Sequence, residues 1–269
     1  MAEDTRMPLL EHESSETPVF TAANLLEAAR IRKGLPKVAV PAGCLLNFDG
    51  ELVQYLTATG RAIEETGWPC FHTRLFRWRA GNAEYGVIGG TIGAPFAVLV
   101  AEELFATGCK ALISISSAGL IAENLAPPFF LLIERALRDE GTSHHYLPPG
   151  RFAAPDPGLV SFVERRLADF PATVRKGASW TTDAPFRETE RLIASRRSEG
   201  IVSVEMEAAA LLAMGEALRR PVLCLAHVTN AMATRTEDFE KGGDQGLTTA
   251  FSLCSRALDA VLEYSTKNP

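Results

Sequence analysis

The chain has few cysteines, and their spacing pairs none of them. Cys44, Cys70, Cys109, Cys224 and Cys254 stand far apart in the sequence. No CxxC pair and no zinc-type spacing of cysteine and histidine occurs, which excludes a disulfide framework and a zinc site. We expect all five side chains to be reduced, small and mostly buried.

Long apolar runs and an excess of positive charge are also missing. No segment reaches the roughly 18 unbroken apolar residues that a membrane helix needs, and no N-terminal stretch places a basic region before an apolar run. The 27 lysines and arginines against 33 acidic residues give a formal charge of −6, which offers no general attraction for nucleic acid or anionic membranes. The sequence predicts a cytoplasmic protein that binds neither.

The remaining composition is that of an ordinary globular protein. The 269 residues are 46% hydrophobic and 22% charged, which excludes a mostly disordered chain. Residues 1–18 differ, because acidic residues alternate there with Ser and Thr and few side chains can anchor them in a core. We expect a mobile acidic tail over 1–18 and a single domain over 19–269.

Short apolar runs alternate with helical patterns through most of the chain. This alternation predicts an α/β domain with a central mixed, largely parallel sheet and helices on both faces. The expected strands are 44–48, 71–78, 85–89, 111–116, 129–136, 173–180, 201–204 and 222–228. The expected helices are 50–62, 95–107, 158–167, 189–196, 207–218 and 247–264, preceded by one that opens at Thr21 or Ala22 and stops near Gly34.

Ligands of open α/β sheets bind beyond the C-terminal ends of the strands. Two turns there are rich in glycine or serine, 89–95 (GGTIGAP) and 114–119 (SISSAG). Glycines let the backbone approach a ligand closely, but an ordinary βα turn explains the first cluster more simply when it is taken alone. The serines of the second turn need hydrogen-bond partners, which either a ligand or the neighbouring backbone would supply.

Two glutamates stand where an apolar strand meets an Ala-rich helix. Glu205 and Glu207 precede the apolar stretch 208–212 (AAALL). A carboxylate in such surroundings is costly unless it is paired or functional. Acidic residues also suit a helix N-terminus, but capping does not require two of them. We therefore interpret both glutamates as functional.

Histidines and arginines give weaker signals. His227 falls in an apolar strand and is interpreted as a satisfied core residue, whereas His144 and His145 lie in a polar loop. There is no HExxH, no clustered metal-ligand spacing and no GxSxG elbow, so we predict neither a metal site nor a serine hydrolase. The arginines of 74–79 either form a solvated strand face or reach an anion.

Together these turns resemble the nucleoside phosphorylase superfamily, which includes uridine phosphorylase, hexameric purine nucleoside phosphorylase and the methylthioadenosine/S-adenosylhomocysteine nucleosidases. The similarity runs over residues 20–264. Its motifs are 204–211 (VEMEAAAL), 91–95 (TIGAP) with 102–104 (EEL), 138–143 (RDEGTS) and 182–183 (TD). The last two resemble the uridine phosphorylase branch. The resemblance implies that family's α/β fold and cleavage of the N-glycosidic bond of a purine or pyrimidine nucleoside.

The resemblance also implies how the sugar is held. Glu205, Met206, Glu207 and Ser117 would bind the ribose, and the Glu207 carboxylate would accept hydrogen bonds from the 2′- and 3′-hydroxyls. Glycosidic cleavage passes through an oxocarbenium-like sugar. Negative charge beside it stabilises the transition state more than the ground state, so Glu207 is expected to be catalytic.

For the base, the resemblance points to the turns after two other strands. Phe186, or the neighbouring Pro185, would pack on the base. Arg191 aligns with an arginine that uridine phosphorylase uses there, but Thr189 stands where a glutamine is expected. Asn230 falls where purine-cleaving relatives carry Asp or Asn. An Asn can hydrogen-bond a departing 6-oxopurine but cannot deliver a proton.

The phosphate site departs from the family pattern. The stretch 48–52 (FDGEL) replaces a Gly-Asp-Pro-x-Arg turn, and Ser114 replaces an arginine. Each missing arginine would supply a charge-assisted contact of about 1.5–3 kcal/mol. One alternative is phosphorolysis, with phosphate as co-substrate held by Ser114, Ser117, the Gly93 backbone and Arg74 from a neighbouring subunit.

Two further alternatives stay open. Water replaces phosphate in one of them, and Glu51 or Asp49 orients it as a general base. The other is a nucleoside-binding protein without turnover. No further cofactor and no metal is expected. Relatives of this kind are dimer-based oligomers, commonly hexamers, so we expect a homo-oligomer, although Thr21 stands where such partners usually lend a histidine.

Overall fold

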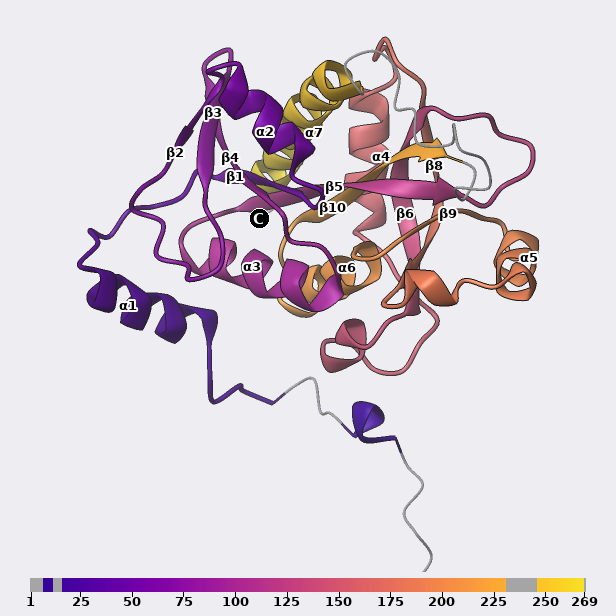
Figure 1. Ribbon diagram of the computed structural model, residues 1–269, viewed down its shortest axis with the longest axis horizontal. Coiled ribbons are helices and arrows are strands. Elements are labelled where there is room, and N and C mark those ends of the chain that lie inside the picture. The colour runs from indigo at the N-terminus through magenta and orange to yellow at the C-terminus, as the bar shows by residue number, and fades with distance from the viewer. Residues whose placement is uncertain (1–6, 12–15, 231–245, 269) are drawn as a thin grey trace, which may run out of the picture.

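The computed structural model describes residues 7–11, 16–230 and 246–268 of the chain. Figure 1 shows a central sheet with helices above and below it. The strands are β1 Gly43–Asn47, β2 Ala62–Glu64, β3 Phe76–Ala80, β4 Ala83–Gly89, β5 Ala111–Leu120, β6 Phe129–Asp139, β7 Phe152–Ala153, β8 Val174–Thr182, β9 Ile201–Glu205 and β10 Val222–Asn230. The α/β class expected from the sequence is confirmed.

The helices cover both faces of the sheet. In Figure 1, α3 and α6 lie on one side and α2 and α7 on the other, and each pair belongs to its own apolar cluster. The helices are α1 Ala22–Lys33, α2 Glu51–Ala58, α3 Ala94–Ala106, α4 Pro157–Arg166, α5 Glu190–Ser198, α6 Ala208–Ala217 and α7 Leu247–Lys267, with short 3₁₀ turns η1 Pro8–Leu10, η2 Thr142–His145 and η3 Pro185–Arg187.

Strand pairing brings the ends of distant strands together. The order is β10-β6-β8-β9-β5-β1-β4-β3-β2, and β10 also pairs with β5. Strands β5, β10, β6, β8 and β9 therefore pair in a closed ring. The ring places the C-terminal end of β9 beside the ends of β8 and β5, with Glu205 opposite Thr181 and Val204 opposite Gly119.

The sheet is more evenly mixed than the sequence predicts. Parallel pairs join β1 to β4 and β5, β10 to β5, and β8 to β6 and β9. Antiparallel pairs join β10 and β7 to β6, β3 to β2 and β4, and β9 to β5. Ring closure causes part of this difference, because β6 and β9 each meet one neighbour running the opposite way.

Several predicted boundaries were wrong. The helix predicted over 50–62 ends at Ala58, and Gly60, with φ of 68°, turns the chain into β2. The strand predicted over 71–78 begins only at Phe76. The preceding loop is instead held by side chains, since Trp68 Nε1 donates to Thr73 Oγ1 at 3.0 Å and that hydroxyl donates to Cys70 Sγ at 3.2 Å.

Other expectations are confirmed. Thr21 caps α1, because its side chain accepts the Asn24 N–H, and Gly34 with φ of 64° ends that helix. All five cysteines are free and buried. Within the described segments, no helix combines the length and apolar character needed to cross a bilayer. The boundary of the N-terminal tail stays a prediction.

Candidate functional site

Glu207 stands where β9 passes into α6. It occupies the N-cap position of a helix whose residues from Ala208 to Gly215 are all buried, and its own side chain is 3% exposed. The carboxylate accepts the backbone N–H of Gly93 at 2.8 Å and that of Met206 at 3.3 Å. The β4–α3 turn therefore meets this glutamate directly, because Gly93, with φ of 91°, presents its N–H there.

The surroundings of Glu207 disfavour its charge. Burial raises its pKa to about 8, and the negative charges of Glu205 and Asp49 add to the rise, whereas the N–H groups of Gly93 and Met206 oppose it. A buried carboxylate is stabilised by hydroxyl donors and by a nearby positive charge. A ribose would supply both, because its 2′- and 3′-hydroxyls donate hydrogen bonds and its ring develops positive charge during bond cleavage.

Glu205 faces away from Glu207 into the protein. Its Oε1 accepts from the Thr181 hydroxyl at 2.6 Å and from Ser179 Oγ at 3.2 Å, and its Oε2 accepts the N–H groups of Glu207 and Ala208 at 2.8 and 2.6 Å. This corrects the expectation that Glu205 binds ribose. The Glu205 carboxylate instead links β8 to the start of α6 by these hydrogen bonds and so holds Glu207 in position.

Asp49 and Ser117 meet at the ends of β1 and β5. Ser117 Oγ donates to Asp49 Oδ2 at 2.8 Å, while Asp49 Oδ1 accepts from Asn47 Nδ2 at 2.9 Å and from the Glu51 N–H at 3.1 Å. A carboxylate thus hydrogen-bonds Ser117, the serine that the resemblance assigns to phosphate. Glu51 was named first as the candidate base, but the observed contact with Ser117 is made by Asp49.

A small cavity adjoins this carboxylate. Its volume is about 20 Å³, and Asn47, Asp49, Glu51, Ser117 and His227 are among its lining residues. A cavity of roughly 10–15 Å³ or more holds one water if polar groups surround it. The cavity is the size of one water molecule.

Two of the predicted phosphate ligands lie elsewhere. Ser114 is 1% exposed and faces Cys224 in the middle of β5, because the strand continues to Leu120 rather than ending at Ser116. Arg74 forms an ion pair with Glu64 on the surface of its own chain. Arg77 likewise pairs with Glu65 and Glu84. The structure therefore corrects the expectation that Ser114 binds an anion, and it gives Arg74 an acidic partner.

The predicted base-binding residues stand on the loops after β8 and β10. Phe186 lies on η3 and is 99% exposed, and Arg191 is exposed in the first turn of α5. Thr189 caps that helix by accepting the Leu192 N–H at 3.3 Å. Asn230 ends β10 opposite Gly119, but its side chain lies outside the described part of the chain. In the described part of the chain, the Glu207 carboxylate hydrogen-bonds Gly93 and Met206 instead.

Sequence reasoning missed three polar residues at the same strand ends. Thr181 anchors Glu205 and also accepts the Ala209 N–H at 2.9 Å. Thr91 is fully buried, and its hydroxyl finds no partner among the described residues. Asn47 accepts the Leu52 N–H at 2.9 Å. The available signal was their position near strand ends: Asn47 and Thr181 are among the last two residues of β1 and β8, and Thr91 follows β4 by two residues. His227 is buried as predicted, and its ring stacks on Phe130 with centroids 4.5 Å apart.

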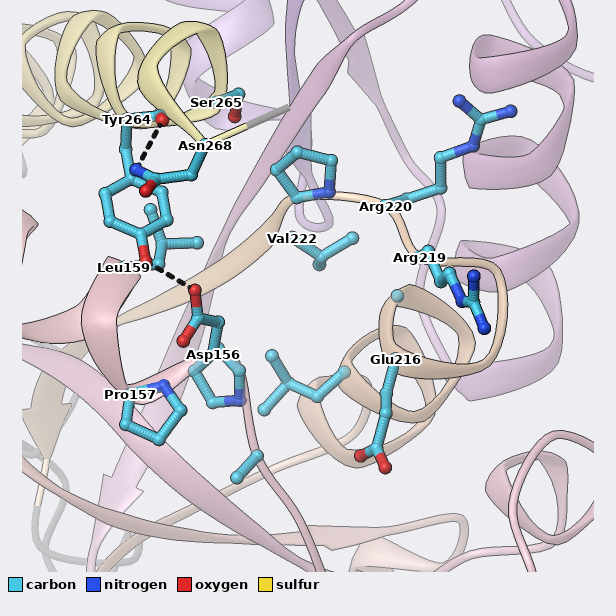
Figure 2. A pocket seen from close by; sticks show the side chains of 15 residues that line it. Asp156, Pro157, Leu159, Glu216, Arg219, Arg220, Val222, Tyr264, Ser265 and Asn268 are labelled. Atoms are coloured by element: carbon cyan, nitrogen blue, oxygen red, sulfur yellow. Dashed lines mark hydrogen bonds between the residues drawn. The ribbon is translucent and has the colours of Figure 1, made fainter.

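Larger hollows lie away from Glu207. Figure 2 shows a cavity of about 500 Å³ where β10 begins and α6 and α7 end, with Asp156, Arg219, Arg220 and Tyr264 around it. A second, of about 520 Å³, lies between α1, α3 and η2 and reaches Asp183. None of the predicted site residues that the structure describes lines either cavity. Within the described residues, no group of three or more His, Cys, Asp or Glu is arranged to hold a metal ion.

The chain is similar in sequence to known nucleoside phosphorylases. The chain is similar to guanosine phosphorylase of Halorubrum lacusprofundi, with 23% identity over 54% of the chain and 66% of the relative. It is also similar to the DeoD-type purine nucleoside phosphorylase of Shewanella denitrificans, with 25% identity over 65% of the chain and 74% of the relative.

Solved structures share the fold. Uridine phosphorylase from Vibrio fischeri, complexed with 6-hydroxy-1-naphthoic acid, superposes with a TM-score of 0.72 at 17% identity, covering 87% of this chain and 99% of that one. Purine nucleoside phosphorylase from Toxoplasma gondii in complex with immucillin-H gives 0.70 at 17%, covering 85% and 93%. The profile of the phosphorylase superfamily matches residues 41–259, and the chain belongs to this superfamily.

Proposed function

We propose that this protein cleaves the N-glycosidic bond of a nucleoside and that water, rather than phosphate, accepts the sugar. The observation that carries the proposal is the Ser117–Asp49 hydrogen bond beside a cavity of about 20 Å³. The named relatives are phosphorylases. The proposed difference from them is the molecule that accepts the sugar, which is water here.

The sugar side of the site supports cleavage. Glu207 is held by the backbone N–H groups of Gly93 and Met206, and its own N–H donates to the Glu205 carboxylate. Its carboxylate is thus placed before substrate arrives, and a preorganised group stabilises developing positive charge without reorganising. Binding of the 2′- and 3′-hydroxyls would favour the ionised form that burial disfavours.

The acceptor side supports water. The Asp49 carboxylate hydrogen-bonds Ser117, the serine that the resemblance assigns to phosphate. The same carboxylate can accept a proton from water as a general base. Asp49 is oriented for this by Asn47 and by the Glu51 N–H, and Ser117 would hold the water from its other side.

The base side supports a broad class of leaving group. Phe186 offers an exposed aromatic face on the loop after β8. We propose that it stacks on the base, with Arg191 and Asn230 contacting the ring edge. An Asn suits a 6-oxopurine such as that of inosine.

The acceptor is tested by identifying the sugar product. Purified protein is incubated with inosine, guanosine or uridine, with and without inorganic phosphate, and the products are separated by chromatography. We expect free ribose at the same rate in both conditions. Ribose 1-phosphate formed only with phosphate would show phosphorolysis and overturn the proposed acceptor. Tight binding of a nucleoside without release of base would show a binding protein.

Matched variants test the base. Asp49→Asn keeps the shape of the side chain but cannot take a proton, so we expect kcat to fall by about 10²–10⁴-fold. Glu51→Gln, two residues along the chain, is the matched control. It should retain most of the activity, because Glu51 holds Asp49 through its backbone N–H, which the substitution keeps. A larger loss in Glu51→Gln than in Asp49→Asn would reverse the assignment.

A further inference from the structure

The segment between β6 and β7 is folded around one buried arginine. Arg138 is 8% exposed. Its guanidinium donates to Ser143 Oγ at 2.9 Å and to the carbonyls of Ser143, Leu147 and Pro148 at 3.0, 3.1 and 2.8 Å. A rigid guanidinium with five donors fixes several acceptors at once, so residues 140–148 form a locally rigid unit.

A buried glutamate also stabilises this unit. Glu140 is 6% exposed and accepts the Ser143 N–H at 2.9 Å. Tyr146 donates to Glu102 on α3. The segment is thus bound to the helix that begins beside Gly93, the residue whose N–H binds Glu207.

One hydrogen bond links the rigid unit to the loop after β8. The Gly141 N–H donates to Asp183 Oδ2 at 2.8 Å. Asp183 directly follows β8, and three residues later Phe186 stands on η3. The far end of this loop is held through α5, because Arg196 on that helix forms an ion pair with Asp139 at 3.4 Å, and Asp139 also accepts the Trp180 Nε1–H at 2.9 Å.

We infer that Asp183 is a positioning residue that sets where loop 183–189 holds the base, with the unit folded around Arg138 as its fixed point. The inference rests on the proposed function for the identity of the ligand. Asp183 needs no contact with substrate. Through the Gly141 N–H it holds the start of the loop, and with it the place of Phe186.

The test compares two substitutions at one position. Asp183→Asn keeps an oxygen that can accept the Gly141 N–H, whereas Asp183→Ala removes it. In Asp183→Ala we expect KM for inosine and uridine to rise about tenfold with kcat changed less than about threefold. Product inhibition by hypoxanthine or uracil should weaken by a similar factor, and inhibition by ribose should stay unchanged. Asp183→Asn should behave like the unmodified protein.

A structural measurement keeps the test independent of turnover. In Asp183→Ala, amide hydrogen exchange should quicken over residues 183–189 and stay slow over 140–148. Asp169→Ala is the control, because this exposed acid pairs with Arg256 away from the site, and it should change neither quantity.

The outcomes separate the two proposals. Unchanged exchange over 183–189 in Asp183→Ala overturns the positioning role whatever the activity. Equal loss of base and ribose inhibition also overturns it, because it indicates general damage. If the unmodified protein neither cleaves nor binds any nucleoside, the proposed function fails, and the exchange data alone decide whether Asp183 positions the loop.

Discussion

At the scale of single residues, Glu207 and Glu205 show how two neighbouring carboxylates acquire different roles. Both are buried, but Glu205 accepts four hydrogen bonds from protein groups, whereas Glu207 accepts two backbone N–H groups. Burial raises the pKa of both carboxyls, and the four hydrogen bonds that Glu205 accepts oppose that rise. Glu207 is therefore the carboxylate with remaining capacity for a ligand.

This difference predicts a pH dependence of stability. The Glu207 pKa is raised to about 8 from an ordinary value of 4.5, so the folded chain keeps a proton that the unfolded chain has lost. The stability that this group contributes is complete below pH 4.5 and is lost as the pH rises through about 8. Glu207→Gln removes the titration. Denaturant unfolding should therefore show the unmodified protein losing on the order of a few kcal/mol relative to the variant between about pH 5 and about pH 9.

The comparison uses only the change with pH, because the new amide alters stability by a constant amount. A parallel pH profile for both proteins would contradict the raised pKa of Glu207. Glu205 adds to the raised pKa of Glu207, so its own titration changes with the substitution, whereas titrating groups distant from this pair cancel.

At the scale of elements, the segment over residues 140–148 replaces regular secondary structure by side-chain hydrogen bonds. Only the short turn η2 is helical there. The hydrogen bonds of the Arg138 side chain stabilise this segment, as backbone hydrogen bonds stabilise helices and sheets elsewhere. Hydrogen bonds to a buried charge are stronger than neutral ones, and losing them is costly.

Arg138→Lys should consequently destabilise the fold while keeping the charge. A lysine presents three donors from one point and cannot reproduce the planar guanidinium. We expect a loss of about 2–3 kcal/mol in the free energy of unfolding, measured with denaturant. Arg79→Lys is the control, since that side chain is 81% exposed, and its effect should stay within about 0.5 kcal/mol. Equal effects of the two substitutions would show that the hydrogen bonds of Arg138 add little.

The sequence predicts elements well where a local pattern decides them. Helix α1 follows from Thr21 and Gly34, and α6 from its alanines, because capping and burial act within a few residues. The orientation of Glu205 was not predictable in this way. It depends on Thr181, which is distant in the chain and reaches Glu205 only through the β8–β9 pairing.

The position of Ser114 differs from the prediction for a related reason. Ser114 was placed at a strand end by local hydrophobicity, but β5 continues because β10 and β9 pair with its later residues. The pairing of β5 with distant strands therefore determines which of its serines is exposed. Ser117, three residues on, is the exposed one.

At the scale of the whole molecule, apolar side chains gather beside the second large cavity. Phe20 and Leu99 line it and are 70% and 40% exposed, and the adjacent Val19 is fully exposed. Exposed apolar groups of this size indicate a protein interface. We propose that a second copy of the chain covers this face in a homo-oligomer.

Phe20→Asp should weaken that association. A carboxylate on an apolar interface loses hydration without gaining a partner, so sedimentation velocity should show a smaller species than the unmodified protein at equal concentration. Ile63→Asp, on β2 and 76% exposed, is the matched control and should leave the sedimentation coefficient unchanged. A monomeric unmodified protein would contradict the expectation.

Glu207 and loop 183–189 stand in different parts of the fold, the first at the start of a buried helix and the second on the surface. Because Glu207 caps a helix enclosed on all sides up to Gly215, few substitutions can shift this acid without disturbing the interior. Loop 183–189 is surface chain, attached through Asp183 and α5. Under the proposed function, substitutions confined to this loop would change which nucleobase is accepted and would leave Glu207 in place. Transplanting that loop from a homologue of different preference is the corresponding route for redesign.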